Sequence, residues 1–494
     1  MKHNNHKLER NIILDADSYK NDHGRMLKYG VEFMESSIVP RKPSKTATHV
    51  VATGHQYLIK AYLTQRLTKE MIDEAQVEIE EQGYEFDRER WEYILDKYDG
   101  KLPLLVRAVP EGTVLPVGTP VVRIVNTDRK CAWLVSYIET MFQRGIWYAT
   151  TVASIARELK EFMQETMLRH SGESFVDYHL HNFGSRGCDS YEDDITSSMA
   201  HALLFNGSDS MQANRNIKFY YNTNKAYTSS VIATEHSVTC SNSNAATRDD
   251  FAMAEKAIRL LEQAVIRFEK TGKGVPIVSV VIDTYDAYRF VREFIGTRLR
   301  NALIELGKRG GRLVLRPDSG NATTMPIDII KIAMEKFGYT INAQGYKVLP
   351  SYIGVLQGDG INQESIREIV ANLDKEQISI QNLLFGMGGK LTHPEGGRDH
   401  FSFAMKATAQ YSKDDGWEDL FKDPITDVGK RSLKGRVTTF KCNQSGKIFA
   451  ERVELQEVNK FITDMMVDCY KDGEAMNEST FDESRVRANH GLAA

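Results

Sequence analysis

The segment Arg312–Gly320 constrains this chain more than any other, because an apolar run there leads directly into an arginine, an aspartate and a glycine. Three further segments are built in the same way, namely Ile277–Asp286, Ile353–Gly360 and Leu383–Gly389. In a barrel of parallel strands, functional groups gather at the C-terminal ends of the strands. We therefore expect one site that contains Asp283, Arg316, Asp318, Asp359 and the pair Gly388 and Gly389.

These residue types suit an anionic, sugar-containing ligand. Carboxylates bind a metal ion or the vicinal hydroxyls of a ribose, and an arginine fork binds phosphate. Adjacent glycines let backbone N–H groups approach a phosphate closely. The pattern thus indicates a site for a phosphorylated sugar.

Two kinds of sequence pattern indicate two kinds of structure. Short apolar runs between turn residues predict antiparallel strands over Leu104–Asp128 and Gly435–Ala450, with Asn443–Gly446 as a hairpin loop. Between these regions, strands alternate with amphipathic helices, which are predicted at Ala252–Lys270, Phe290–Lys308 and Ile327–Phe337. The strand ends lie roughly 30 to 40 residues apart, near the ~30 residues per unit of an eight-unit barrel. The fold class is therefore α/β.

Length, charge and cysteine content set further limits. At 494 residues the chain is long enough for two domains, and its formal net charge of -4 disfavours nucleic acid as a partner. Five scattered cysteines without a C-x-x-C pair argue against a disulfide framework and a zinc site. Residues Met1–Arg10 lack the apolar stretch of a signal peptide, and no segment has spanning length. We expect a cytoplasmic protein that does not associate with membranes.

Further motifs follow one another along the chain: Asp15–Lys20, His181–Gly187, Phe205–Asp209, Ser230–Ser237, Phe421–Pro424 and Lys430–Ser432. Together with the four strand ends, they resemble the nicotinamide phosphoribosyltransferase family, and the similarity runs from Asn11 to Phe481–Arg485. The resemblance implies a type II phosphoribosyltransferase with an irregular parallel α/β barrel over residues 151–394. Residues 1–150 and 395–494 are expected to form a second, β-rich domain, built from both termini, that contributes to a dimer interface.

The activity implied by this resemblance joins nicotinamide to phosphoribosyl pyrophosphate. It yields nicotinamide mononucleotide and pyrophosphate in NAD salvage, requires Mg²⁺ and is coupled to ATP hydrolysis. The active enzyme would be a homodimer with its active sites at the subunit interface. Oxygen ligands of this kind would accept Mn²⁺ as well as Mg²⁺.

The resemblance also implies how the pyridine is bound. Phe183 and, from the partner subunit, Tyr19 would stack on the two faces of the ring. Asp209 would accept a hydrogen bond from the amide nitrogen, where a nicotinate carboxylate would be repelled. Asp17 and Ser230 would also contact substrate. Taken singly, each side chain is more commonly a core residue or a helix cap, so only the surrounding motifs support the functional interpretation.

For the phosphate side, the resemblance makes His236 the residue that is phosphorylated in ATP coupling. Asp283 and Asp318 would lie nearest the magnesium ion. Together with Arg316 and His236, these two aspartates would form the catalytic group. The ribose and 5′-phosphate would be held by Arg316, Asp318, Gly358, Asp359, Gly388 and Gly389. A clamp for pyrophosphate and phosphate would consist of Arg186, Arg398, Lys406, Lys430 and Arg41, partly contributed across the dimer.

Several residues depart from the family pattern. Ser185 replaces an aromatic residue, Asn182 stands where aspartate is usual, and Ile232 replaces a proline. Lys390 replaces a third glycine, and the segment Thr392–Gly397 alters the approach to Arg398. None of these changes removes a candidate catalytic group.

Three alternatives remain open. A nicotinate phosphoribosyltransferase would share the barrel and the cosubstrate, although Asp209 speaks against it. A barrel lyase or aldolase would need a strand-borne lysine for a Schiff base, and the four strand ends carry none, with Lys390 one step beyond a glycine pair. A non-catalytic dimeric binding protein could retain the same fold.

Overall fold

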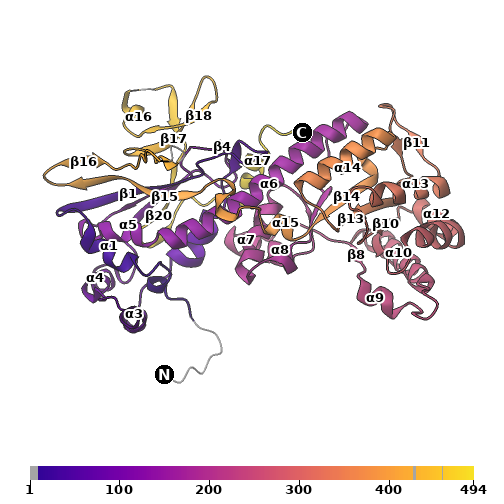
Figure 1. The fold of residues 1–494 in the computed structure, drawn as a ribbon, viewed down its shortest axis with the longest axis horizontal. Coiled ribbons are helices and arrows are strands. Elements are labelled where there is room, and N and C mark those ends of the chain that lie inside the picture. Colours follow the sequence, from indigo (N-terminus) through magenta and orange to yellow (C-terminus); the bar gives the residue numbers. More distant parts are fainter. Residues whose placement is uncertain (1–8, 427–429, 459, 494) are drawn as a thin grey trace. The chain divides into compact units, whose positions relative to one another are not determined.

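The computed structural model describes residues 9–426, 430–458 and 460–493, which form two compact units (Figure 1). The terminal unit comprises Met1–Ser154, Asn216–Asn224 and Glu395–His490. The barrel unit comprises Ile155–Arg215, Lys225–Pro394 and Gly491–Ala494. Of the N-terminal segment considered above, residues 1–8 lie outside the described residues.

A sheet of parallel strands forms the centre of the barrel unit. Its strands are β6 (Leu180–Asn182), β7 (Gly207–Ser208), β8 (Ile232–Ala233), β9 (Ile277–Val281), β10 (Arg312–Arg316), β13 (Ile353–Gln357) and β14 (Leu383–Met387). They lie in the order β7-β6-β14-β13-β10-β9-β8. Ser229, just before β8, forms a parallel bridge with Gly207 of β7, so the two edges of the sheet meet. The strands therefore follow one another around a ring in chain order, and the prediction of an irregular parallel α/β barrel is confirmed.

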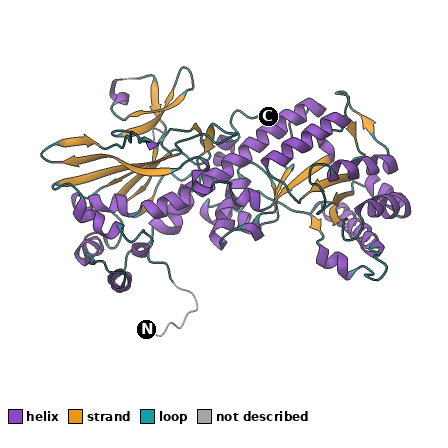
Figure 2. Ribbon diagram, in the orientation of Figure 1, coloured by secondary structure: helices purple, strands orange, loops and turns teal. Residues whose placement is uncertain are grey.

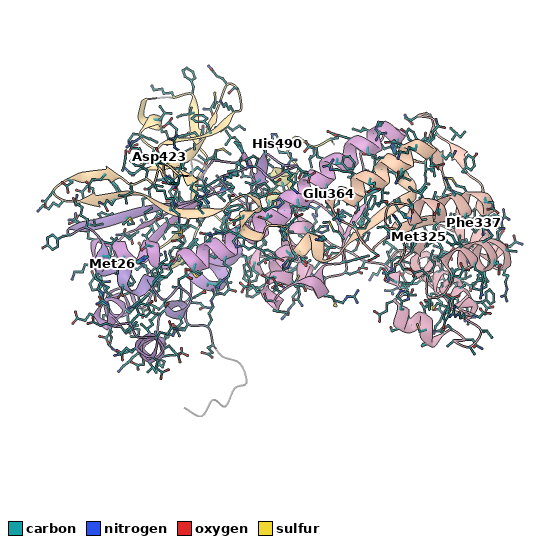
Figure 3. The ribbon with its side chains drawn as sticks, viewed as in Figure 1. Met26, Met325, Phe337, Glu364, Asp423 and His490 are labelled. Carbon is teal, nitrogen blue, oxygen red and sulfur yellow. The ribbon has the colours of Figure 1, made fainter. Side chains whose placement is uncertain are left out.

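Helices flank these strands (Figure 2). They are η4 (Ser185–Gly187), α7 (Tyr191–Ala202), α9 (His236–Ser241), α10 (Phe251–Thr271), α11 (Ala287–Arg289), the π-helix η5 (Phe290–Arg298), α12 (Arg300–Lys308), α13 (Met325–Phe337), α14 (Gln363–Glu376), η6 (Ile380–Asn382) and α15 (Gly389–Thr392). Figure 3 labels both ends of α13, Met325 and Phe337. A short hairpin of β11 (Thr340–Ile341) and β12 (Lys347–Val348) completes the unit. The division between the units falls within α6 (Glu139–Ser171), and α8 (Gln212–Tyr220) also has residues in both.

The helix predictions for Ala252–Lys270 and Ile327–Phe337 are confirmed by α10 and α13. The single helix predicted over Phe290–Lys308 is wrong, because a π-helix precedes α12 and the two are separated at Leu299. The Leu299 N–H bonds to the Phe294 carbonyl, five residues earlier, and the Thr297 hydroxyl donates to the Arg292 carbonyl. Such side-chain to backbone bonds compete with the regular α-helical pattern.

The terminal unit is rich in antiparallel strands from both ends of the chain. Its large sheet has the order β16-β15-β1-β5-β3-β20-β21 and consists of β1 (Val31–Val39), β3 (Leu104–Ala108), β5 (Val122–Asn126), β15 (Ala404–Ser412), β16 (Gly416–Asp419), β20 (Val467–Lys471) and β21 (Glu474–Ala475). Smaller sheets pair β2 (His49–Val51) with β4 (Val114–Pro116), and β17 (Val437–Cys442) with β18 (Ile448–Arg452) and β19 (Ile462–Asp464). Both antiparallel regions predicted from sequence are confirmed, including the hairpin at Asn443–Gly446.

The helices of the terminal unit are η1 (Ile12–Leu14), α1 (Lys20–Met26), α2 (His55–Leu58), the π-helix η2 (Ile59–Leu63), α3 (Lys69–Glu81), α4 (Arg88–Tyr98), η3 (Arg129–Cys131), α5 (Ala132–Tyr137), η7 (Gly397–His400), α16 (Leu455–Val458) and α17 (Phe481–Ala488). Met34, Val106 and Ile124 of the large sheet are buried in one apolar core with Leu134 of α5. All five cysteines are free thiols. Within the described ranges, no helix combines the length and the apolar character needed to span a membrane.

Candidate active site

The candidate site begins at the C-terminal edge of the barrel strands. Arg316 is the last residue of β10, and Asp283 and Asp359 each lie two residues beyond β9 and β13. Gly388 directly follows β14. Because these strands pair in parallel and in sequence, their C-terminal ends share one edge of the sheet.

Two aspartates and a histidine meet at this edge. The Asp318 backbone N–H donates to Oδ2 of Asp283 at 2.8 Å, and the Ser319 hydroxyl donates to the same oxygen at 2.5 Å. His236 begins α9, and its Nε2 lies 3.6 Å from Asp283 Oδ1 and 3.7 Å from Asp318 Oδ2. Nδ1 of His236 lies 3.3 Å from the Thr284 hydroxyl. The imidazole thus faces both carboxylates.

The two carboxylates fit a divalent cation. Oδ1 of Asp283 is buried and has no hydrogen-bond partner among residues 9–426, 430–458 and 460–493, while the Asp318 side chain is 37% exposed. Mg²⁺ is commonly held by one or two carboxylates and completes its coordination with water and substrate phosphates. No cluster of three or more His, Cys, Asp or Glu side chains suited to a metal occurs in the described part of the chain. The donor set therefore suits a cation that is shared with a phosphate ligand.

Phe183 lies over the ends of two strands. Its N–H donates to the Met387 carbonyl at 2.9 Å, and the Arg316 guanidinium lies 5.9 Å from its ring centre. A Cβ atom at Gly386 would overlap Cε2 of Phe183, and one at Gly358 would lie 3.4 Å from it. These glycines therefore leave the space that the aromatic ring occupies.

Arg316 is also held by the Thr234 carbonyl, which accepts a hydrogen bond from Nη2 of Arg316 at 2.9 Å. Its buried Nε has no hydrogen-bond partner among the residues that the structure describes. The guanidinium thus has donor capacity left for a ligand such as phosphate.

Asp209 follows β7, next to the strand that carries Phe183. Its N–H donates to the Asn182 carbonyl at 3.0 Å, and its Oδ1 accepts from the Ser230 hydroxyl at 2.5 Å. His181 is buried beside it, and burial lowers the pKa of His181 although the Asp209 charge opposes that shift. Burial thus favours the uncharged form of the imidazole next to the Asp209 carboxylate.

Two glycine segments approach each other at the other end of this edge. A Cβ atom on Gly187 would lie 2.8 Å from the α-carbon of Gly389, so position 187 has no room for a larger residue. Arg186, which precedes Gly187 in η4, is exposed. Gly388 and Gly389 accept the N–H groups of Leu391 and His393, which closes the α15 turn.

The remaining predicted residues belong to the terminal unit. The Lys406 ammonium lies 3.4 Å from Glu139, and Asp17 accepts from the Thr140 hydroxyl at 2.8 Å, so both gather at the start of α6. Tyr19 is 53% exposed and packs against His23.

Two further terminal-unit cations, Arg41 and Arg398, contact residues of the segment 399–402. Arg41 donates from Nε to the Ser402 carbonyl at 2.8 Å, and Arg398 lies 3.6 Å from Asp399. Lys430 is exposed.

The barrel unit thus brings together the strand-end residues, His236, Phe183, Asp209 and Ser230, whereas Asp17, Tyr19, Arg41, Arg398, Lys406 and Lys430 lie in the terminal unit. The functional roles of both groups stay predictions. The sequence analysis missed Thr234, Thr284 and Ser319, which contact Arg316, His236 and Asp283. Ser319 and Thr284 adjoin predicted site residues, which was a usable signal. The Thr234 contact is made by a backbone carbonyl, for which the side-chain pattern has no signal.

Comparisons with known proteins agree with this architecture. A family model described as the nicotinate phosphoribosyltransferase family matches residues 178–464, and one for the nicotinamide phosphoribosyltransferase N-terminal domain matches residues 11–106. A nicotinamide phosphoribosyltransferase of Xanthomonas campestris pv. campestris is 33% identical over 488 residues, covering 97% of this chain and 98% of the relative. The enzyme of that name from Acinetobacter baylyi is 30% identical over 515 residues, covering 97% of each chain.

Solved structures support the fold. Nicotinate-nucleotide pyrophosphorylase from Pyrococcus furiosus superposes with a TM-score of 0.58 at 15% identity, over 99% of this chain and 97% of that one. Human nicotinic acid phosphoribosyltransferase superposes with a TM-score of 0.58 at 16% identity, over 96% and 93%. The fold is therefore that of a type II phosphoribosyltransferase. The chain belongs to the nicotinate phosphoribosyltransferase family, and the two relatives that it matches over nearly their full length are named nicotinamide phosphoribosyltransferases.

Proposed function

We propose that this protein is a nicotinamide phosphoribosyltransferase. It joins nicotinamide to phosphoribosyl pyrophosphate and releases nicotinamide mononucleotide and pyrophosphate, as a step of NAD salvage. The observation that carries the proposal is that Phe183 and Asp209 directly follow the paired ends of the adjacent strands β6 and β7, where the Asp209 N–H donates to the Asn182 carbonyl. A carboxylate accepts a hydrogen bond from an uncharged carboxamide, whereas it repels the carboxylate of nicotinate. The names of the two full-length relatives support the same choice.

In this proposal the pyridine nitrogen attacks C1 of the ribose while the C1–O bond breaks, and the bonding electrons leave with pyrophosphate. Stacking on Phe183 contributes about 0.5–1.5 kcal/mol beyond area burial and orients the ring. Arg316 and the Gly388–Gly389 backbone hold the 5′-phosphate, and Asp318 and Asp359 hold the ribose. Asp283 and Asp318 would hold Mg²⁺, or Mn²⁺ in its place, which when bound neutralises charge on the leaving pyrophosphate.

His236 is proposed to couple ATP hydrolysis to this reaction. A ring nitrogen accepts the γ-phosphoryl group while ADP leaves, and water later releases phosphate from the phosphohistidine. The exposed position of His236, with 44% of its side chain accessible beside Asp283 and Asp318, supports this role.

The proposed active form is a homodimer. Tyr19 would reach the pyridine from the partner subunit, and Arg41, Arg398, Lys406 and Lys430 would complete the pyrophosphate clamp together with Arg186. The exposure of Tyr19 and the position of these cations on the terminal unit support the proposal. The five free thiols support a reducing, cytoplasmic location.

A product assay tests the proposed function. The protein is incubated with phosphoribosyl pyrophosphate, Mg²⁺ and either nicotinamide or nicotinate, and each mononucleotide is quantified by chromatography. We expect nicotinamide mononucleotide from nicotinamide and far less product from nicotinate. Turnover of nicotinate alone would overturn the proposal, and turnover of neither would favour a non-catalytic protein.

The same assay with and without ATP tests His236. We expect His236→Ala to retain weak transferase turnover and to lose stimulation by ATP. Unchanged stimulation in the variant would exclude His236 as the phosphoryl acceptor.

A further inference from the structure

Asp194 is a buried carboxylate that contacts both loops of the proposed nicotinamide pocket but belongs to neither. It lies in the first turn of α7 and is 8% exposed. No ion pair with Lys, Arg or His involves it among the residues described here. A buried charge is costly unless hydrogen bonds compensate it, so the partners of this carboxylate are informative.

Three serine hydroxyls from three different segments donate to Asp194. Ser185 donates to Oδ2 at 2.7 Å, while Ser198 and Ser210 donate to Oδ1 at 3.0 and 2.9 Å. Ser185 lies two residues after Phe183, and Ser210 lies directly after Asp209. One carboxylate therefore links the loop that carries the aromatic ring to the loop that carries the amide acceptor.

A second route leads from Asp194 to the Phe183 loop. The Ser198 hydroxyl accepts from Asn182 Nδ2 at 3.2 Å, and Oδ1 of Asn182 accepts from the Gly184 N–H at 2.8 Å. Asn182 and Ser198 are 1% and 0% exposed. The Asn182 side chain and the Gly184 N–H, on the two sides of Phe183, are thus tied to the same buried network.

Helix capping does not account for these contacts. The N-terminus of α7 is already capped by Ser190, whose hydroxyl accepts from the Asp193 N–H at 3.1 Å. Two of the three Asp194 bonds leave the helix for the pocket loops, and the third goes to Ser198 one turn further along α7. The arrangement is that of a support for the pocket.

We propose that Asp194 is a positioning residue for nicotinamide. It does not touch the substrate, but it sets the separation of Phe183 and Asp209 through Ser185 and Ser210. This inference rests on the proposed function, since it concerns the pyridine pocket of that activity. In the described part of the chain, Asp194 forms no hydrogen bond with the proposed phosphoribosyl pyrophosphate residues at β10, β13 and β14, and their affinity is expected to be independent of it.

Asp194→Asn tests the inference, because the amide keeps the size of the side chain but loses the charge and one acceptor oxygen. We expect the dissociation constant and the KM for nicotinamide to rise by about tenfold, the loss expected for a hydrogen bond to a charged group. The dissociation constant for phosphoribosyl pyrophosphate should stay within about twofold of the wild-type value, and kcat should change little. Binding is measured by calorimetry, and the melting temperature is recorded alongside.

Asp193→Asn is the matched control, since it makes the same change one residue earlier, at a carboxylate that, among the described residues, accepts a hydrogen bond only from the Ser190 hydroxyl. It should leave both substrate affinities unchanged. Ser185→Ala should weaken nicotinamide binding, whereas Ser185→Thr, which keeps the hydroxyl, should bind nicotinamide as the wild type does. Ser185→Ala should have less effect on this binding in the Asp194→Asn background than in the wild-type background. If Asp194→Asn fails to fold, Ser185→Ala and Ser210→Ala carry the test, because both keep the carboxylate.

The possible outcomes separate this inference from the proposed function. A wild-type protein that neither binds nor converts nicotinamide would overturn the proposed function and the inference with it. Normal nicotinamide binding by the wild type together with unchanged binding by the variants would overturn the inference alone. Equal loss of affinity for both substrates, in step with a lower melting temperature, would show that Asp194 has only a structural role and would also overturn it.

Discussion

The two units hold their candidate site residues in different ways. In the barrel unit, site groups bond to one another: Asp283 accepts from the Asp318 backbone and the Ser319 side chain. In the terminal unit, Lys406 and Arg398 have 43% and 51% of their side chains exposed and make single long ion pairs. Exposed pairs of this kind contribute at most about 1 kcal/mol. The candidate residues of the barrel unit therefore hold one another in place, whereas Lys406 and Arg398 of the terminal unit are held only weakly.

The candidate site residues of the two units also differ in charge. The barrel edge carries the carboxylates Asp209, Asp283, Asp318 and Asp359, whereas most of the candidate phosphate-binding cations belong to the terminal unit. Pyrophosphate needs both a metal held by carboxylates and direct cationic partners. We therefore predict that the leaving group needs residues of both units.

The largest expected effect on kcat comes from a substitution among the hydrogen-bonded site residues of the barrel unit. Asp283→Asn should lower kcat by about 10²–10³, because it removes a charge that faces His236 and would hold the metal. Steady-state kinetics with nicotinamide measure this loss. Asp286→Asn, three residues further on at the cap of α11, should keep near wild-type kcat. A kcat for Asp283→Asn within threefold of wild type would place the catalytic charge elsewhere.

A complementation experiment can show whether Tyr19 of one subunit and Asp283 of the other act in the same active site. Asp283→Asn, in the barrel unit, should be nearly inactive, and Tyr19→Ala, in the terminal unit, should lose about tenfold in activity through the lost stacking. If active sites are shared across a homodimer, mixing the two after reversible dissociation should recover about a quarter of wild-type activity, because half the dimers would contain one intact site. Native mass spectrometry verifies that mixed dimers formed. Mixed dimers without recovered activity would contradict a shared site.

A smaller change is expected at the specificity residue. Asp209→Asn should raise the KM for nicotinamide about tenfold, through loss of a charged acceptor, and should increase turnover of nicotinate because repulsion is removed. The ratio of kcat/KM for the two substrates is the measurement. Ser230→Ala keeps the carboxylate and should have an intermediate effect. An unchanged ratio in Asp209→Asn would remove Asp209 as the discriminating group.

The smallest expected effect is on stability against pH. Burial, reinforced by the charge of Arg312, lowers the pKa of His179 in the barrel unit to about 4. The unfolded chain takes up this proton near pH 6.5, so the stabilisation is complete above pH 6.5 and is lost as the pH falls toward 4. His179→Gln should reduce the drop in melting temperature between pH 7.5 and pH 5 by about 2 °C.

His55 is the counterpart in the terminal unit. Burial also lowers the pKa of His55, but Glu111, whose Oε1 lies 3.4 Å from Nδ1, opposes the shift. His55→Gln should therefore change the pH-dependent part of stability less than His179→Gln does. An equal or larger change at His55 would contradict this difference between the units.

Much of the barrel edge could be predicted because its signals are local. An apolar run followed by Arg316 and Asp318, or by Gly388 and Gly389, identifies a strand and its end within ten residues. Closure of the barrel was not predictable in this way. β7 and β8 have two residues each, too short for a periodic pattern, and the bridge between Gly207 and Ser229 depends on distant segments.

The sequence by itself determined which chemical groups this protein has and at which strand ends they lie, because strand polarity and turn residues are encoded within short segments. Only the tertiary structure decided which groups support one another. Asp194 and its three serines are spread over Ser185–Ser210, and only the Ser198 contact follows from helical spacing. The other two require β6, β7 and α7 to pack together, because hydrogen bonds depend on distance in space and side-chain periodicity reports only the local conformation.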